Sequence, residues 1–188
     1  MAQAQTLTEV QLRCCLKWCK MRRHSTRDTT ILYVSYYAGL RAKEIAALTI
    51  NNVFDEQCSV REQFVLAASQ TKGAKTRTVW INAKLRRQLE QFRKQLQSKH
   101  PNDALFQSQK GGAFSANTMT QLFLNIYRAA GFENASSHSG RRTFITELAS
   151  KGVSVRVLAE LAGHSSIQTT QRYIDVNPQQ MSAAVELL

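Results

Sequence analysis

The chain lacks several features that would place it in other classes of protein. No apolar run in its 188 residues is long enough to span a membrane. The start MAQAQTLTEV has neither the charged region nor the apolar middle of a signal peptide, so we predict a cytoplasmic protein with no membrane partner. Internal repeats and low-complexity segments are also missing. Because 43% of the residues are hydrophobic, we expect one folded domain over residues 1–188.

Cysteine is scarce and does not form a disulfide framework. Three of the four cysteines, Cys14, Cys15 and Cys19, crowd one predicted helix, where neighbouring side chains point in different directions and cannot bridge readily; Cys58 stands apart. Cys15, Cys19 and His24 would supply three zinc ligands, but no fourth ligand is evident. We therefore predict buried thiols that act as small apolar groups in a reducing compartment, with no metal and no cofactor.

Acidic residues are few as well. The chain has 13 of them against 25 Lys and Arg, which gives a formal net charge of +12. Such a surplus favours a polyanionic partner, since each phosphate contact releases condensed counterions. Charge alone does not distinguish DNA from RNA, or either from a surface charge that keeps the protein soluble.

Apolar spacing typical of helices covers most of the chain. Thr8 with Gln11 forms a capping-box pattern for a helix that ends near Lys20, and Gly39 is placed to end a second helix in a left-handed conformation. Further caps are predicted at Asp28, Ser115 and either Ser136 or Ser137. The predicted helices cover residues 9–20, 29–38, 42–49, 83–97, a stretch from 115 to 131, a stretch that carries residue 141 and ends before 152, and residues 155–161, 167–173 and 178–188.

One region departs from the helical pattern. Residues 63–66 and 78–81 alternate with the period of strands, and a basic turn, Lys72-Gly73-Ala74-Lys75, lies between them. The sequence therefore predicts a mainly α domain with a small antiparallel β-sheet, an α+β fold.

The polar residues that do not fit a core stripe suit chemistry on a phosphodiester. Arg41 and Arg141 are planar cations that match two non-bridging oxygens, so they are placed to bind a phosphate as its negative charge grows during in-line attack. Tyr173 offers a phenolate nucleophile that would form a covalent phosphotyrosine. Lys72 or Lys75 would protonate the departing deoxyribose oxygen. With arginines to hold the charge, no metal is required.

Two histidines complete this set. His138 and His164 would orient the phosphate and handle the proton of the nucleophile near neutral pH. Taken singly, Tyr173 fits a half-buried packing residue and His164 a helix cap, but together with the arginines we expect them to be functional. Lys75, Arg77 and Arg142 are predicted to contact DNA, and Glu44 either holds a guanidinium or lies in solvent.

Three motifs in a fixed order resemble the catalytic domain of the tyrosine recombinases, the phage integrase family. They are Gly39-Leu40-Arg41 followed by Glu44-Ile45 and Leu48, then His138-Ser139-Gly140-Arg141, then Gly163-His164-Ser165-Ser166 followed by Thr169-Thr170 and Tyr173. The resemblance runs from about Leu7 to Tyr173.

The resemblance implies a role for each candidate residue. Arg41 and Arg141 match the arginines that bind the scissile phosphate, His138 and His164 match the histidines of the second and third motifs, and Tyr173 matches the nucleophile. The turn lysine of the family is similar to Lys72. The family cleaves DNA through a 3′-phosphotyrosyl link with a free 5′-hydroxyl, and exchanges strands in a tetramer.

Two departures from the family pattern stand out. Asn52 occupies a place where an acidic residue is usual, which puts a supporting contact in doubt. The helical core-binding domain that usually precedes the catalytic domain is absent from these 188 residues, which fits either an excised domain or a minimal natural member.

The resemblance also predicts partners and location. Double-stranded DNA is the expected substrate, with a tetramer on DNA and a monomer without it; accessory DNA-bending proteins are candidate partners. The predicted helix over residues 178–188 would dock on a neighbouring subunit or pack on its own domain. The protein would be associated with the nucleoid of a bacterial or phage-infected cell. A site-specific recombinase or integrase is therefore predicted; the alternatives are nicking and rejoining like that of type IB topoisomerases, or a DNA-binding regulator without turnover.

Overall fold

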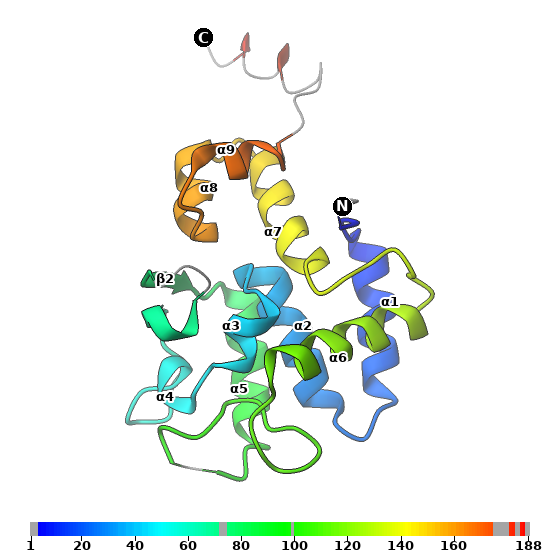
Figure 1. Ribbon diagram of the computed structural model, residues 1–188, viewed down its shortest axis with the longest axis vertical. Coiled ribbons are helices and arrows are strands. Elements are labelled where there is room, and N and C mark those ends of the chain that lie inside the picture. The colour runs from blue at the N-terminus through cyan, green and yellow to red at the C-terminus, as the bar shows by residue number, and fades with distance from the viewer. Residues whose placement is uncertain (1–3, 72–74, 99, 175–180, 183–184, 187–188) are drawn as a thin grey trace.

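The computed structural model describes residues 4–71, 75–98, 100–174, 181–182 and 185–186. It confirms the predicted fold class, because these residues form mostly helices and one small antiparallel sheet, which lies at an edge of the domain (Figure 1). No helix in these described stretches is long and apolar enough to cross a membrane. The elements in chain order are α1 (Glu9–Lys20), α2 (Ser25–Ala38), α3 (Ala42–Ala46), α4 (Ile50–Val53), β1 (Gln63–Leu66), the 3₁₀ helix η1 (Ala68–Gln70), β2 (Arg77–Trp80), α5 (Ala83–Arg93), α6 (Ala116–Ala129), α7 (Ser139–Ser150), α8 (Val155–Ala162) and α9 (Ile167–Gln171).

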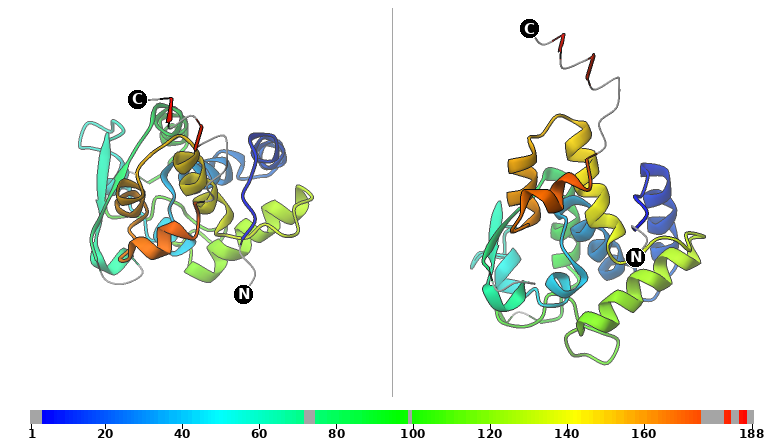
Figure 2. Two further views of the ribbon diagram at one scale, coloured as in Figure 1. Left: turned by 90° about the horizontal axis from the view of Figure 1, so that it is seen from above. Right: turned by 45° about the horizontal axis from the view of Figure 1, so that its top comes forward.

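Helix α2 forms the centre of the domain. Ile31 and Leu32 are almost completely buried, and α1, α5 and α7 all pack against this helix (Figures 1 and 2). The predicted capping box of Thr8 and Gln11 begins α1, whose buried side chains include Cys15 and Cys19. Burial of those thiols agrees with their predicted use as small apolar groups.

The beginning of α2 differs from the prediction. The helix starts at Ser25 rather than after Asp28, and His24 occupies the N-cap position without a side-chain cap. Asp28 is buried within the first turn, where its carboxylate lies 2.9 Å from Nε of Arg22 and 2.8 Å from an amino nitrogen of Arg27. An acidic residue flanked by two arginines is neutralised as an ion pair, so it does not need to cap the helix.

The two strands pair antiparallel, with Gln63 opposite Trp80 and Leu66 opposite Arg77. The second strand begins and ends one residue earlier than predicted. Alternation places Phe64 and Leu66 of β1 on the buried face, and the same rule turns Arg77 and Val79 of β2 inward.

Helices α7, α8 and α9 lie together at one end of the domain (Figure 1). The N-cap of α7 is His138, not Ser136 or Ser137 as predicted. The backbone N–H of Ser136 donates to the hydroxyl of Ser139 at 2.9 Å, which closes the turn and carries the helix start one residue further. The buried apolar side chains of α8, which are Leu158, Ala159 and Ala162, lie outside the main hydrophobic core.

Several other boundaries differ from the predicted ones. Helix α3 ends at Ala46, α5 ends at Arg93 and α9 ends at Gln171, all earlier than the apolar spacing indicated, and the short α4 was not predicted. Ser115 caps α6 as predicted, through the N–H of Thr118. The predicted turn at Lys72 and most of the predicted helix over residues 178–188 lie outside the described residues.

Candidate active site

The first motif places Arg41 at a sharp turn between two helices. Gly39 ends α2 with a φ of 63°, a left-handed conformation that favours glycine, and its Cβ would lie only 2.5 Å from the Phe144 ring. Arg41 then occupies the N-cap of α3, and its backbone N–H donates to Glu44 at 2.9 Å. A guanidinium nitrogen of Arg41 donates to the other carboxylate oxygen at 2.8 Å. Glu44 therefore holds a guanidinium, and the alternative of a solvated Glu44 is wrong.

A second arginine shares that carboxylate. An amino nitrogen of Arg77 lies 3.3 Å from Oε2 of Glu44, and the other amino nitrogen donates to the Leu161 carbonyl at 3.0 Å. The Arg77 side chain is only 4% exposed. The residue predicted as a DNA contact thus has its guanidinium inside the protein, bonded to α3 and to the end of α8.

The positive charges of Arg77, Arg141 and Arg41 therefore lie close to the Glu44 carboxylate. Burial by itself raises the pKa of the Glu44 carboxyl, but Arg77, the Arg41 backbone N–H, and the charges of Arg141 and Arg41 together hold that pKa below its ordinary value. The carboxylate is therefore ionised near neutral pH and offsets part of the positive charge of the site.

The second motif supplies a buried guanidinium. Arg141 on α7 is 4% exposed; it donates to the Gly39 carbonyl at 2.7 Å and also to the Ala162 carbonyl. Burial, with Arg41 and Arg77 nearby, lowers the pKa of Arg141 to about 9. The two carbonyl bonds use two of five N–H donors, so the guanidinium retains donors for an anion.

His138 lies one helical turn ahead of Arg141, at the exposed N-cap of α7. A spacing of three residues puts the two on the same side of the helix. Arg142, which follows Arg141, donates to the Ala4 carbonyl at 2.8 Å. Its guanidinium carbon lies 5.9 Å from the centre of the Tyr173 ring.

The third motif brings His164 and Tyr173 together. Their rings are nearly parallel, with an interplanar angle of 19° and centroids 5.8 Å apart. Nδ1 of His164 lies 2.8 Å from the hydroxyl of the buried Thr170. Burial, with Arg141, Arg41 and Arg77 nearby, lowers the pKa of His164 to about 4. The imidazole is consequently neutral near pH 7 and able to accept a proton.

A cleft of about 470 Å³ opens beside these groups. Arg41, Lys75, Arg77 and His164 are among its lining residues, so the structure brings together predicted residues from three distant segments. Lys72 lies outside the described residues. The lining also includes Thr71 and Glu160, which sequence reasoning missed. Glu160 had a usable signal, because it stands one helical turn before His164.

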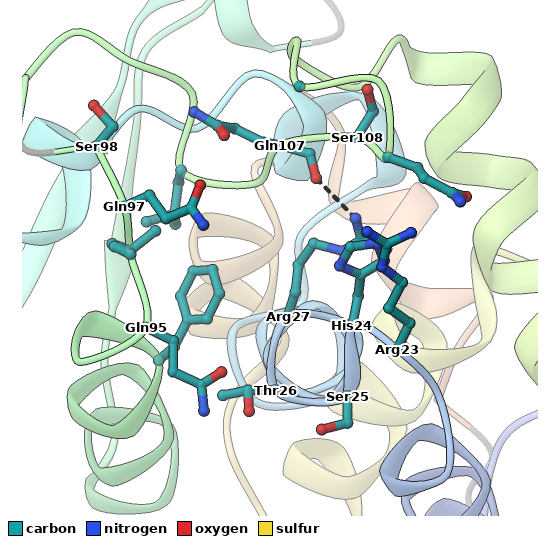
Figure 3. Close-up of a pocket in the computed structure, with 15 residues that line it drawn as sticks. Arg23, His24, Ser25, Thr26, Arg27, Gln95, Gln97, Ser98, Gln107 and Ser108 are labelled. Carbon is teal, nitrogen blue, oxygen red and sulfur yellow. Dashed lines mark hydrogen bonds between the residues drawn. The ribbon is translucent and has the colours of Figure 1, made fainter.

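A larger cavity, of about 520 Å³, lies near the start of α2 (Figure 3). Arg27, which lines it, donates to the Gln107 carbonyl at 2.8 Å, and its guanidinium is also paired with Asp28. Arg23, His24 and several glutamines are among the other residues that line it. None of the predicted site residues is among the described residues that line this cavity, so it is separate from the candidate active site. Within the described parts of the chain, no three His, Cys, Asp or Glu side chains form a group that could hold a metal.

Comparisons with known proteins agree with this arrangement of motifs. The model of the phage integrase family matches residues 5–180. The chain belongs to that family. It is 34% identical over 155 residues to the tyrosine recombinase XerD of Pseudomonas putida. The aligned residues cover 80% of this chain and 50% of that protein. The chain spans about half the length of the curated relatives it matches.

Solved structures share the fold of this family member. The XerA recombinase superposes with a TM-score of 0.77 at 23% identity, over 99% of this chain and 66% of that one. The catalytic domain of the bacteriophage HP1 integrase superposes with a TM-score of 0.67 at 23% identity, over 98% of this chain and 95% of that one. The fold of this chain is therefore shared over nearly the full length of the HP1 structure.

Proposed function

We propose that this chain is the catalytic part of a site-specific DNA recombinase that cleaves and rejoins DNA through Tyr173. The observation that carries the proposal is the stacking of Tyr173 on a neutral His164, in a site where Arg41 and Arg141 supply guanidinium donors. An imidazole that is kept neutral has a lone pair for a hydrogen bond from the phenol, and the two arginines favour the negative charge of a phosphodiester under attack.

The proposed reaction balances without a cofactor. The Tyr173 oxygen attacks phosphorus as its proton passes to His164, and the bond from phosphorus to the 5′-oxygen breaks. The departing oxygen keeps the electron pair of the broken bond and accepts a proton from Lys72 or Lys75. The products are a 3′-phosphotyrosine and a free 5′-hydroxyl, which regenerates the DNA by the reverse attack.

Lys75 and Arg142 are proposed DNA contacts. Lys75 is exposed and lines the cleft beside Arg41, so its ammonium is accessible to a backbone phosphate. Arg142 is part-buried near Tyr173 and would contribute one bond to the same strand. His138, exposed one turn ahead of Arg141, would donate to the scissile phosphate.

We also propose that strand exchange takes place in a tetramer on double-stranded DNA, with the segment over residues 178–188 docked on a neighbouring subunit. The exposed apolar side chains of Met181 and Val185 support an apolar docking partner for this segment. Accessory DNA-bending proteins and association with the nucleoid remain part of this proposal.

The experiment is the capture of the covalent intermediate. Wild-type protein and Tyr173→Phe are incubated, without added metal, with a pool of nicked duplexes whose central sequence is randomised and whose cut strand cannot rejoin. We expect a protein–DNA band that survives denaturation with the wild type only; sequencing of that band identifies the site. The Phe variant retains the ring beside His164, so it is a matched control for folding. An adduct of equal yield with Tyr173→Phe would refute the proposed nucleophile.

A further inference from the structure

Arg77 connects three parts of the domain that are far apart in sequence. It lies on the inward face of β2, donates to Glu44 of α3, 33 residues away, and donates to the Leu161 carbonyl in α8, 84 residues away. Its side chain is 4% exposed, compared with 19% for Arg41. Both amino nitrogens of this guanidinium are bonded to acceptors of the protein itself.

The backbone that leads to His164 is shaped to fit around Arg77. Gly163 ends α8 with a φ of 62°, and a Cβ at this position would collide with Cδ of Arg77. Only glycine combines this left-handed conformation with the close approach of the arginine side chain. His164 is the next residue, and both His164 and Arg77 line the same cleft.

The end of α8 is held by two guanidiniums at once. The carbonyls in the last turn of a helix have no partner within the helix and carry partial negative charge. Arg77 bonds one of them, that of Leu161, and Arg141 bonds the next, that of Ala162. The peptide units immediately before His164 are thereby fixed to the same arginines and glutamate that surround the proposed phosphate site.

We infer that Arg77 is a positioning residue, which holds the end of α8, and hence His164, against the Glu44–Arg41 pair. The inference rests on the proposed cleavage of DNA, because it is His164 beside Tyr173 whose placement matters. Arginine is required because its planar fork reaches two acceptors in different elements, whereas the single ammonium of a lysine satisfies one of them. Arg77 is not assigned a contact with DNA.

The test compares Arg77→Gln and Arg77→Lys with the wild type in two measurements. The first is the titration of the His164 imidazole by NMR, with its signal assigned by comparison with His164→Gln. The second is the yield and rate of the covalent adduct on the duplex selected from the randomised pool, measured over a range of DNA concentrations. Arg128→Gln is the matched control, because it removes one exposed positive charge from α6, away from α8.

If Arg77 positions His164, the pKa of His164 rises in Arg77→Gln, because a neighbouring positive charge has been removed. The rate of adduct formation at saturating DNA falls by about 10- to 100-fold with little change in KM, since a misplaced group slows the chemical step. Arg77→Lys keeps the charge and a near-wild-type His164 titration, but it also loses rate. Arg128→Gln changes neither quantity.

Two results would overturn the inference. If Arg77→Gln weakens DNA binding, lowers the salt slope by about 1 and leaves the saturating rate unchanged, Arg77 is a phosphate contact. If only the melting temperature falls, while the His164 titration and the rate per folded molecule stay as in the wild type, Arg77 is merely structural. Where Arg77→Gln does not fold, Arg77→Lys decides: a lower saturating rate with unchanged DNA affinity supports the inference, and a lower affinity with an unchanged saturating rate overturns it. Failure of the wild type to form any adduct would refute the proposed function, and the titration would still test the placement of His164.

Discussion

Thr170 bonds His164 from within the same motif: its buried hydroxyl lies 2.8 Å from Nδ1 of the imidazole. The bond fixes the plane of the ring that stacks on Tyr173, and it also fixes which ring nitrogen faces the cleft. The motif thus contains both a functional histidine and the residue that orients it.

Removal of that hydroxyl should slow cleavage without loss of DNA binding. We expect Thr170→Val, which is similar in shape, to lower the rate of covalent adduct formation by about tenfold, the effect of one lost hydrogen bond. The measurement is the single-turnover rate at saturating DNA. Thr120→Val, on α6, is the control and should retain the full rate. An unchanged rate for Thr170→Val would show that the bond does not orient the imidazole.

The low pKa of His164 predicts how stability depends on pH. Burial, with the nearby arginines, lowers this pKa from 6.5 to about 4, so between these values the unfolded chain binds a proton that the folded chain does not. The contribution of His164 to the free energy of unfolding is therefore complete above pH 6.5 and is lost as pH falls toward 4. Urea unfolding of the wild type and of His164→Gln over this range should show a weaker dependence on pH in the variant. Parallel curves for the two proteins would contradict the assignment.

Arg141 should not be replaceable by lysine. A lysine retains the charge, but it cannot bond the Gly39 and Ala162 carbonyls and still present paired donors to a phosphate. We expect Arg141→Lys to lower adduct formation by at least about 100-fold. The neighbouring Arg142→Lys is the control and should lose far less activity. Equal losses in the two variants would mean that only charge matters at residue 141.

The four cysteines should divide into two classes. Cys15 and Cys19 are buried, and burial is the main reason that the pKa of each thiol is raised to about 12. Cys14 and Cys58 are exposed. A disulfide reagent that reacts with thiolates should therefore label Cys14 and Cys58 in the native protein and all four in denaturant. Rapid native labelling of Cys15 or Cys19 would indicate that α1 is not packed as described.

Local sequence patterns were sufficient to predict several of the turns and helix caps. The glycine at position 39, the Thr8 capping box and the Ser115 cap all act within a few residues, and the structure confirms them. The second motif likewise places Arg141 on the helix predicted to carry it, and His164 follows the glycine that ends α8.

Contacts between distant segments were not predictable in the same way. In the sequence, Arg77 is an ordinary basic residue beside a basic turn and lies outside the predicted strand. In the structure it is the first residue of β2, and its side chain lies inward, against Glu44. Asp28 was predicted as a cap because helix-start patterns consider only the residues that follow, whereas its partners Arg22 and Arg27 lie before it. Asn52, at the position of the missing acidic residue, bonds Thr49 and Gln70 instead of a guanidinium.

The attachment of α8 to the domain has a thermodynamic consequence. The apolar side chains of α8 lie outside the main core, and its last two carbonyls are bonded by Arg77 and Arg141. An anion that binds the remaining N–H donors of Arg141 bonds the same guanidinium that holds the Ala162 carbonyl. Occupancy of the phosphate site and the attachment of α8 are therefore linked equilibria, and by reciprocity each changes the free energy of the other.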